Sequence, residues 1–191
     1  LLPIDHSSLT ESLSWIESKR ISPEIQIRLF LAVLKDKSTR PSLSQSSQVL
    51  NFLCRLIETN NKEIYKMLST CVRRLVNENS LEHFQSCHFF KKYWTSVMEM
   101  NESSVVDASI MSIDKLAETG YIADLNDVIP TLKQVINSYQ QSAEQAIKIL
   151  ATCSQYPECR DALLKYRKYF AKLRETNDFD EECGQFEQNI H

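Results

Sequence analysis

The clearest indication of the fold is the stretch AIKILATCSQYPECRDALL (Ala146–Leu164). Its first half places Ile147, Leu150 and Cys153 three residues apart, which puts them on one face of an α-helix. A polar turn follows, and Pro157 then opens a second apolar helix, because the first turn of a helix does not need the N–H that proline lacks. The stretch therefore predicts two helices joined by a short turn.

Two earlier segments show the same pattern: LNFLCRLIETNNKEIYKML (Leu50–Leu68) and SIMSIDKLAETGYIADL (Ser109–Leu125). Each has apolar residues three apart, then a short polar turn, then a second apolar helix. The spacing from Leu53 to Ile113 is 60 residues and that from Ile113 to Leu150 is 37. The second interval fits a helical repeat of about 35 to 47 residues, and the first does not fit a regular array.

The stretch Ala146–Leu164 resembles the armadillo-repeat signature, and HEAT repeats share its apolar spacing. The resemblance implies an all-α, right-handed α-solenoid of about ten helices, which binds an extended peptide or a partner helix along a groove. Nuclear-import armadillo proteins hold peptides with a ladder of Trp and Asn. The chain departs from them, because its corresponding helix ends read Leu56-Ile57, Leu116-Ala117 and Cys153-Ser154. A single irregular helical domain without repeats is the alternative interpretation.

Capping residues and apolar spacing predict further helices along the chain. Ser22-Pro23-Glu24 is a helix start, Asn60-Asn61 is a break, and Gly120 is a left-handed cap. Pro130 is expected to end one helix and start another. The expected helices cover residues 8–19, 22–35, 47–59, 64–76, 81–98 with a split near Ser86, 102–119, 122–138, 142–153 and 157–174.

We expect one helical repeat domain over residues 1–174, followed by an acidic tail over residues 175–191. Within the domain, a helical pair (8–35) and a polar loop (36–46) precede the repeats (47–174). The tail carries six acidic residues and no Lys or Arg, and its large apolar residues are Phe179, Phe186 and Ile190. So few apolar anchors predict a disordered or loosely docked segment, and an alternative is that this acidic tail folds back onto the basic residues of the last helix.

Composition excludes several classes of protein. The 191 residues include only two glycines, Gly120 and Gly184, which rules out the Gly-rich phosphate loops and the G-x-S-x-G nucleophile elbow. No sustained period-2 alternation indicates strands, so the expected fold class is all-α. A net charge of −3 argues against binding polyanions by bulk charge. No apolar run approaches the ~20 residues that a membrane-spanning helix needs.

Catalytic and metal-binding signatures are weak. His83 and Cys87 are four residues apart and could share one helix face, but a metal site would need further ligands. We therefore expect no metal, no cofactor and no enzymatic activity. The six cysteines form no C-x-x-C motif, which favours reduced thiols that act as small core residues of an intracellular protein. Because the chain begins at Leu1, we expect it to be a segment of a larger protein.

Two basic-aromatic segments are the candidate partner-binding surfaces. The first runs from His88 to Trp94. The second lies in the last expected helix, where three lysines share one face with Tyr169 at its border, and where the end of an array leaves a helix face free. We expect a non-catalytic scaffold that binds an acidic or helical peptide segment of another protein. Nucleic-acid binding and helical oligomerisation are the alternatives. The expected partner-binding residues are Lys165, Lys168, Tyr169, Lys172, Lys91, Lys92, Tyr93 and Trp94.

Overall fold

The computed structural model of the chain describes Glu11, Ser14 and residues 21–77, 80–120, 122–175 and 179–190. Every regular element within these residues is a helix, so the all-α prediction is confirmed. The helix expected over residues 8–19 lies outside the described part of the chain, apart from Glu11 and Ser14.

The chain divides into two compact units, residues 1–112 and 113–191. The division lies within α8 (Ser103–Glu118), whereas the sequence predicts a boundary only after residue 174. Before α8, unit 1 contains α2 (Pro23–Val33), a 3-10 helix (Lys37–Thr39), α3 (Arg40–Ser44), α4 (Ser47–Ile57), α5 (Lys62–Leu75), α6 (Leu81–Ser86) and α7 (Phe89–Met100). After α8, unit 2 contains α9 (Ile122–Ser138), α10 (Gln140–Cys153), a 3-10 helix (Pro157–Cys159), α11 (Arg160–Leu164), α12 (Arg167–Glu175) and α13 (Asp180–Ile190).

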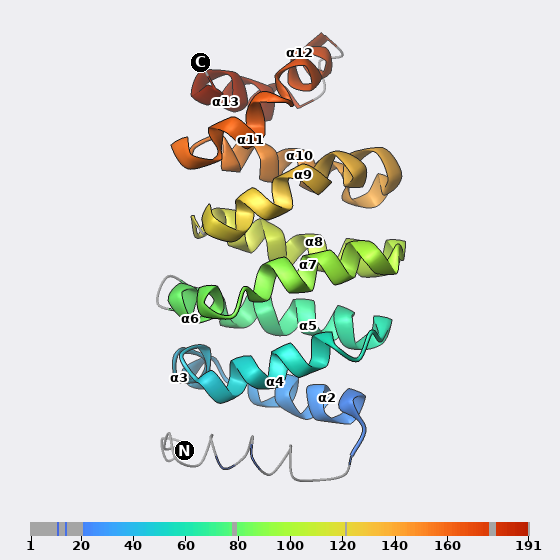
Figure 1. Cartoon of the computed structure of the whole chain (residues 1–191), viewed down its shortest axis with the longest axis vertical. Coiled ribbons are helices and arrows are strands. Elements are labelled where there is room, and N and C mark those ends of the chain that lie inside the picture. The colour runs from blue at the N-terminus through green and yellow to red at the C-terminus, as the bar shows by residue number, and fades with distance from the viewer. Residues whose placement is uncertain are drawn as a thin grey trace. The chain divides into compact units, whose positions relative to one another are not determined.

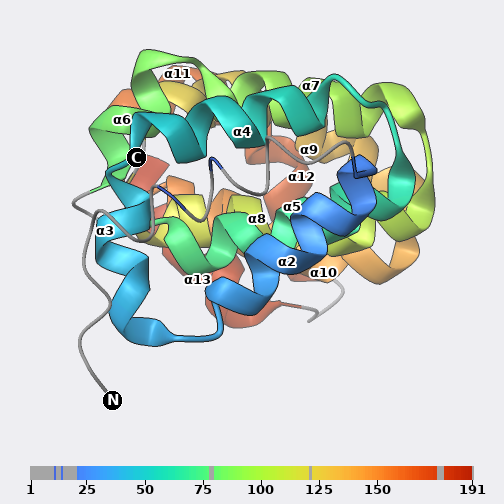
Figure 2. The ribbon, with the colours of Figure 1, turned by 90° about the horizontal axis from the view of Figure 1, so that it is seen from below.

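The helices of unit 1 form two layers. α2 packs beside α5 in one layer, and α4 packs beside α7 in the other (Figures 1 and 2). α4 also contacts α5, which joins the layers. α2 and α5, like α4 and α7, are therefore neighbours in space although at least two helices separate them in the sequence.

The helix boundaries in unit 1 follow local capping chemistry. The Asn61 side chain accepts hydrogen bonds from the backbone N–H groups of Glu63 and Ile64, at 2.9 and 3.3 Å, and so caps α5. Asn60 is left-handed, with φ 49°, so the predicted break at Asn60-Asn61 is confirmed. The predicted split near Ser86 is also confirmed, because α6 ends there and α7 begins at Phe89.

The polar loop predicted for residues 36–46 is wrong for most of its length. The Asp36 side chain accepts a hydrogen bond of 2.9 Å from the backbone N–H of Ser38 and begins a 3-10 helix. α3 follows, with Pro41 in its first turn. Proline does not break a helix there, since the first N–H groups of a helix have no partner within it.

Aromatic and polar side chains fill the interior of unit 1. Tyr65 and Tyr93 stack with ring centroids 5.7 Å apart, and the Tyr93 hydroxyl donates a hydrogen bond of 2.7 Å to Ser109. Trp94 is also buried. The assignment of Tyr93 and Trp94 as partner-binding residues is therefore corrected: both face the core, because α7 turns its aromatic side inward.

Unit 2 is built around α10, which packs against both α9 and α13 (Figure 1). The turn that follows α8 contains Gly120 with φ 70°, which confirms the predicted left-handed cap. A Cβ atom at Gly120 would lie 3.2 Å from Cε1 of Tyr156. The hydroxyl of Tyr156 in turn donates a hydrogen bond of 2.9 Å to the carbonyl of Ala117, so the turn is held by contacts within unit 2.

The break predicted at Pro130 is wrong, because α9 continues through it from Ile122 to Ser138. Proline removes one backbone hydrogen bond from a helix interior. Burial of the neighbouring apolar residues offsets this loss: Val128, Ile129, Leu132 and Val135 all lie in the core. Tertiary packing thus overrides the local preference at this position.

The single last helix predicted from Pro157 to Arg174 is wrong, because a 3-10 helix, α11 and α12 replace it. Between α11 and α12, Tyr166 is buried and its hydroxyl donates a hydrogen bond to the carbonyl of Ile129 in α9. This contact lies at the interruption between the two helices. Lys165 therefore does not lie on the helix that carries Lys168 and Lys172, and the predicted three-lysine strip on one helix is corrected.

Of the disordered and docked alternatives for residues 175–191, the structure contradicts the disordered one, since Asp180–Ile190 form α13. Cys183, Phe186 and Ile190 are buried on one face of this helix. Phe186 stacks on Phe170 of α12 with ring centroids 3.8 Å apart and planes 5° apart. Three apolar side chains suffice because α10 and α12 together provide a surface for them.

Within the described residues, no helix is both long enough and apolar enough to span a membrane. This agrees with the short apolar runs of the sequence.

Candidate interaction cleft

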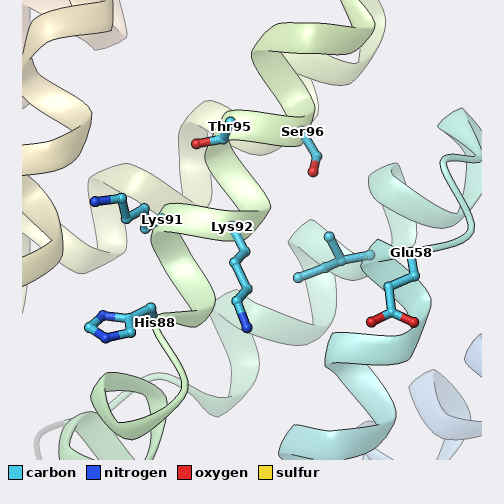
Figure 3. A pocket seen from close by; sticks show the side chains of 7 residues that line it. Glu58, His88, Lys91, Lys92, Thr95 and Ser96 are labelled. Carbon is cyan, nitrogen blue, oxygen red and sulfur yellow. The ribbon is translucent and has the colours of Figure 1, made fainter.

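A surface cleft of about 580 Å³ lies in unit 1 between the end of α4 and the outer face of α7. Figure 3 shows Lys92 extending between α7 and the end of α4, where Glu58 lies. The cleft is lined by Ile57, Glu58, His88, Lys91, Lys92, Thr95 and Ser96. We call this site the α4–α7 cleft.

The amphipathic pattern of α7 places these side chains in the cleft. His88 precedes the helix in a left-handed conformation, with φ 50°. Phe89, Phe90, Tyr93, Trp94 and Val97 form the buried face of α7. Lys91, Lys92 and Thr95 lie on the opposite face and are exposed. Of the first basic-aromatic segment, the structure therefore brings only His88 and the two lysines to one surface.

The charge of the α4–α7 cleft favours an acidic ligand. Lys91 and Lys92 contribute two positive charges at its rim, against one carboxylate from Glu58. Ile57 adds apolar surface, although most of its side chain is covered. Charged groups at a rim accelerate the encounter with a partner of opposite charge, and apolar contacts slow its dissociation.

A pair of cysteines lies next to the cleft. Cys54, in α4, is one turn before Glu58, and Cys87 directly precedes His88. Their sulfur atoms are 3.9 Å apart, and both side chains are half-buried. The sequence predicts reduced core thiols and does not indicate that these two meet, because 33 residues separate them and no C-x-x-C motif is present. The packing of α4 against α6 and α7 brings them together.

The two thiols of this pair differ in acidity. The hydrogen bond from Cys54 lowers the pKa of Cys87 to about 7, with smaller contributions from the backbone N–H of Phe89 and the charge of Lys92, while burial opposes the shift. The same hydrogen bond, together with burial, raises the pKa of Cys54. Cys87 is therefore the more acidic thiol of the pair.

The second predicted surface is divided by the fold of unit 2. Lys168 and Lys172 are exposed and four residues apart on α12. Lys165 is exposed between α11 and α12, where its ammonium lies 5.3 Å from the ring centroid of Tyr166. Tyr169 is half-buried and meets Phe170 edge-on. These four residues do not form one helical strip.

The apolar face of α12 is covered by α13. A small cleft of about 250 Å³ remains there, lined by Arg167, Ala171, Phe186, Glu187 and Ile190. Arg174 and Glu187 form an ion pair across the same two helices. The second basic segment therefore serves in part to hold α13.

The residues that the structure describes contain no cluster of three or more His, Cys, Asp or Glu side chains able to hold a metal ion. The chain matches no family model, no curated protein and no solved structure.

Proposed function

We propose that the chain is a non-catalytic, helical-repeat scaffold that binds an acidic peptide segment of another protein in the α4–α7 cleft. The observation that carries the proposal is the position of Lys91 and Lys92 at the rim of an open cleft of about 580 Å³. Binding sites for ligands have volumes of about 300–1,000 Å³. The armadillo/HEAT-like repeat is part of the same proposal, supported by helix layers in which sequence-distant helices lie side by side.

The aromatic residues of α7 argue against the nucleic-acid alternative. Single-stranded nucleic acids bind by stacking their bases on exposed aromatic rings beside basic side chains. Tyr93 and Trp94 are only 0% and 2% exposed, so neither ring is available to a base. Lys91 and Lys92 remain as exposed charges beside the small exposed part of Ile57, which suits a peptide carrying carboxylates.

Peptide binding by fluorescence anisotropy tests the proposal. The probes are a fluorescein-labelled peptide that alternates Glu with Leu, a matched peptide with Lys in place of Glu, and a single-stranded oligonucleotide. We expect the acidic peptide to bind more tightly than both others at low salt. We expect the double variant K91E/K92E to weaken it at least about 10-fold, because two favourable charges become repulsive.

The matched control is K168E/K172E, which reverses the same number of exposed charges in unit 2. It should leave the affinity for the acidic peptide within about two-fold, since exposed substitutions away from a binding site have small effects. Equal binding of the acidic and basic peptides would contradict the proposal. Stronger binding of the oligonucleotide, lost in K91E/K92E, would favour the nucleic-acid alternative.

A further inference from the structure

The half-buried thiols of Cys54 and Cys87 take no part in the proposed peptide binding, yet they are already in contact. We infer that Cys54 and Cys87 form a dithiol site that hydrogen peroxide or another hydroperoxide oxidises to an intramolecular disulfide. The geometry carries the inference: the sulfur atoms are 3.9 Å apart, and neither side chain is fully buried. The inference does not rest on the proposed function, because no partner protein takes part in it.

The surroundings of the pair decide which sulfur reacts first. Cys87 lies immediately before α7, where the backbone N–H of Phe89 points at its sulfur. The ammonium of Lys92, one turn into α7, adds a positive charge. A helix N-terminus and a nearby cation both stabilise a thiolate. Glu58 lies on the side of Cys54 instead and disfavours a thiolate there. Cys87 is therefore the attacking residue and Cys54 the resolving residue.

The oxidation proceeds in two balanced steps. The Cys87 thiolate attacks one oxygen of hydrogen peroxide, the O–O bond breaks, and hydroxide leaves, which forms a sulfenic acid at Cys87. Cys54 then loses its proton, and its sulfur attacks the Cys87 sulfur. The S–O bond breaks, the S–S bond forms, and the second hydroxide leaves as water with the proton from Cys54. The two thiols together lose two electrons and two protons, and the peroxide becomes two molecules of water. Two molecules of a monothiol such as glutathione reduce the disulfide again: the first forms a mixed disulfide and frees one cysteine thiol, and the second frees the other cysteine and leaves with the first as a glutathione disulfide.

The backbone around Cys87 allows the short approach that the second step requires. The sulfur atoms must move from 3.9 Å to the ~2.05 Å of a disulfide bond. Cys54 is held within α4, but Cys87 lies at the end of α6, in the turn before α7. The adjustment that the bond requires is therefore expected at Cys87, which lies outside both helices.

A second cysteine pair provides an internal control. Cys153 and Cys159 in unit 2 also share a hydrogen bond, which together with burial raises the pKa of Cys153. Both of their side chains are fully buried, each 0% exposed. A peroxide molecule cannot reach them in the folded protein. In both pairs the two thiols lie close together. Only the Cys54–Cys87 thiols are exposed enough for a peroxide molecule to reach them.

Mass spectrometry of the folded chain after treatment with hydrogen peroxide tests the inference. We expect the intact mass to fall by two hydrogen atoms and a proteolytic digest to contain a peptide that links Cys54 to Cys87. The variant Cys54→Ser, whose hydroxyl can still donate a hydrogen bond to the Cys87 sulfur, should instead accumulate a sulfenic acid at Cys87 that dimedone traps. In Cys87→Ala, dimedone should not label Cys54, because the more acidic thiol is missing.

The pH dependence of alkylation provides a second readout that needs no cysteine variant. Cys54 and Glu58 of α4, the Phe89 N–H and Lys92 of α7, and the backbone carbonyls of α6 are the polar groups around the Cys87 sulfur. Iodoacetamide should modify Cys87 with a midpoint near pH 7. Lys92→Ala should slow this reaction at pH 7, and Lys91→Ala, its exposed neighbour on the same helix, should not.

Each outcome supports or overturns the inference. A Cys54–Cys87 cross-link, with Cys153 and Cys159 still reduced, supports it. A disulfide between other cysteines, or no disulfide while both thiols remain reactive to iodoacetamide, overturns it. Equal trapping of Cys54 and Cys87 by dimedone overturns the assignment of Cys87 as the attacking residue.

Discussion

The two basic-aromatic segments have similar sequences but different structural roles. In unit 1, α7 buries Tyr93 and Trp94 and leaves Lys91 and Lys92 at the rim of an open cleft. In unit 2, α12 presents exposed lysines, but α13 covers its apolar side through Phe186. Lysines that alternate with aromatic residues therefore indicate an amphipathic helix. A docking site requires, in addition, that apolar surface beside the charges stay uncovered.

The largest loss of stability should come from weakening the contact between α12 and α13. The variant Phe186→Ala removes the stacked ring from Phe170 and leaves a cavity between α12 and α13. We expect the free energy of unfolding to fall by about 3–5 kcal/mol, the usual cost of truncating a buried phenylalanine. Urea denaturation followed by circular dichroism measures this loss.

Gln188→Ala is the matched control, because Gln188 lies exposed on the same helix. Its effect should stay within about 0.5 kcal/mol. If Phe186→Ala also lost less than about 1 kcal/mol, α13 would not cover α12 in solution, and the two basic segments would be more alike than the structure shows.

The next effect concerns the burial of Tyr93 in unit 1. Burial raises the pKa of Tyr93 from 10.0 to about 12. The unfolded chain releases this proton at the lower pH, so the neutral hydroxyl stabilises the folded state fully below about pH 10. This contribution, about 3 kcal/mol, is lost as the pH rises toward about 12.

Tyr93→Phe isolates this contribution, because burial also raises the pKa of Tyr65 and Tyr166. Urea denaturation between pH 9 and 12 should show a smaller loss of stability in the variant than in the parent chain. Identical pH profiles would mean that Tyr93 is exposed in solution, and it would then become available to a partner, as Tyr169 partly is.

The smallest effect tests the stability of α13 from within the helix. Gly184 lies in α13, and a Cβ atom there would meet nothing within 4 Å. Gly184→Ala should therefore stabilise the chain by up to about 1 kcal/mol, since alanine loses less backbone entropy in a helix.

Gly120→Ala should instead destabilise the chain, because φ is 70° and Tyr156 lies 3.2 Å from the new Cβ atom. Thermal denaturation of both variants measures the difference, and a destabilising Gly184→Ala would argue against a helix at this position.

Local chemistry made much of the fold predictable. The helix start at Ser22-Pro23, the cap at Asn61 and the left-handed turn at Gly120 depend on residues within about four positions of each other. The continuation of α9 through Pro130 and the docking of α13 depend on distant apolar partners. A sequence pattern contains no information about which segments meet, so these features could not be predicted from it.

The candidate site divides in the same way. The amphipathic pattern of α7 was sufficient to identify Lys91 and Lys92 as surface charges, because a helical repeat of 3.6 residues separates them from the apolar face. The same pattern left open whether Tyr93 and Trp94 face the core or a partner, and it could not show that Ile57 and Glu58 complete a cleft. The sulfur contact between Cys54 and Cys87 joins residues 33 positions apart.

The amino-acid sequence by itself determined the fold class, most helix boundaries and the positions of the charged faces, because backbone preference and capping act over a single turn of helix. Only the packing of the helices shows which of those faces stay exposed, which aromatic residues are buried in the core and which thiols are in contact. These properties depend on packing between helices distant in the sequence, where the burial of apolar surface outweighs the preference of any single residue.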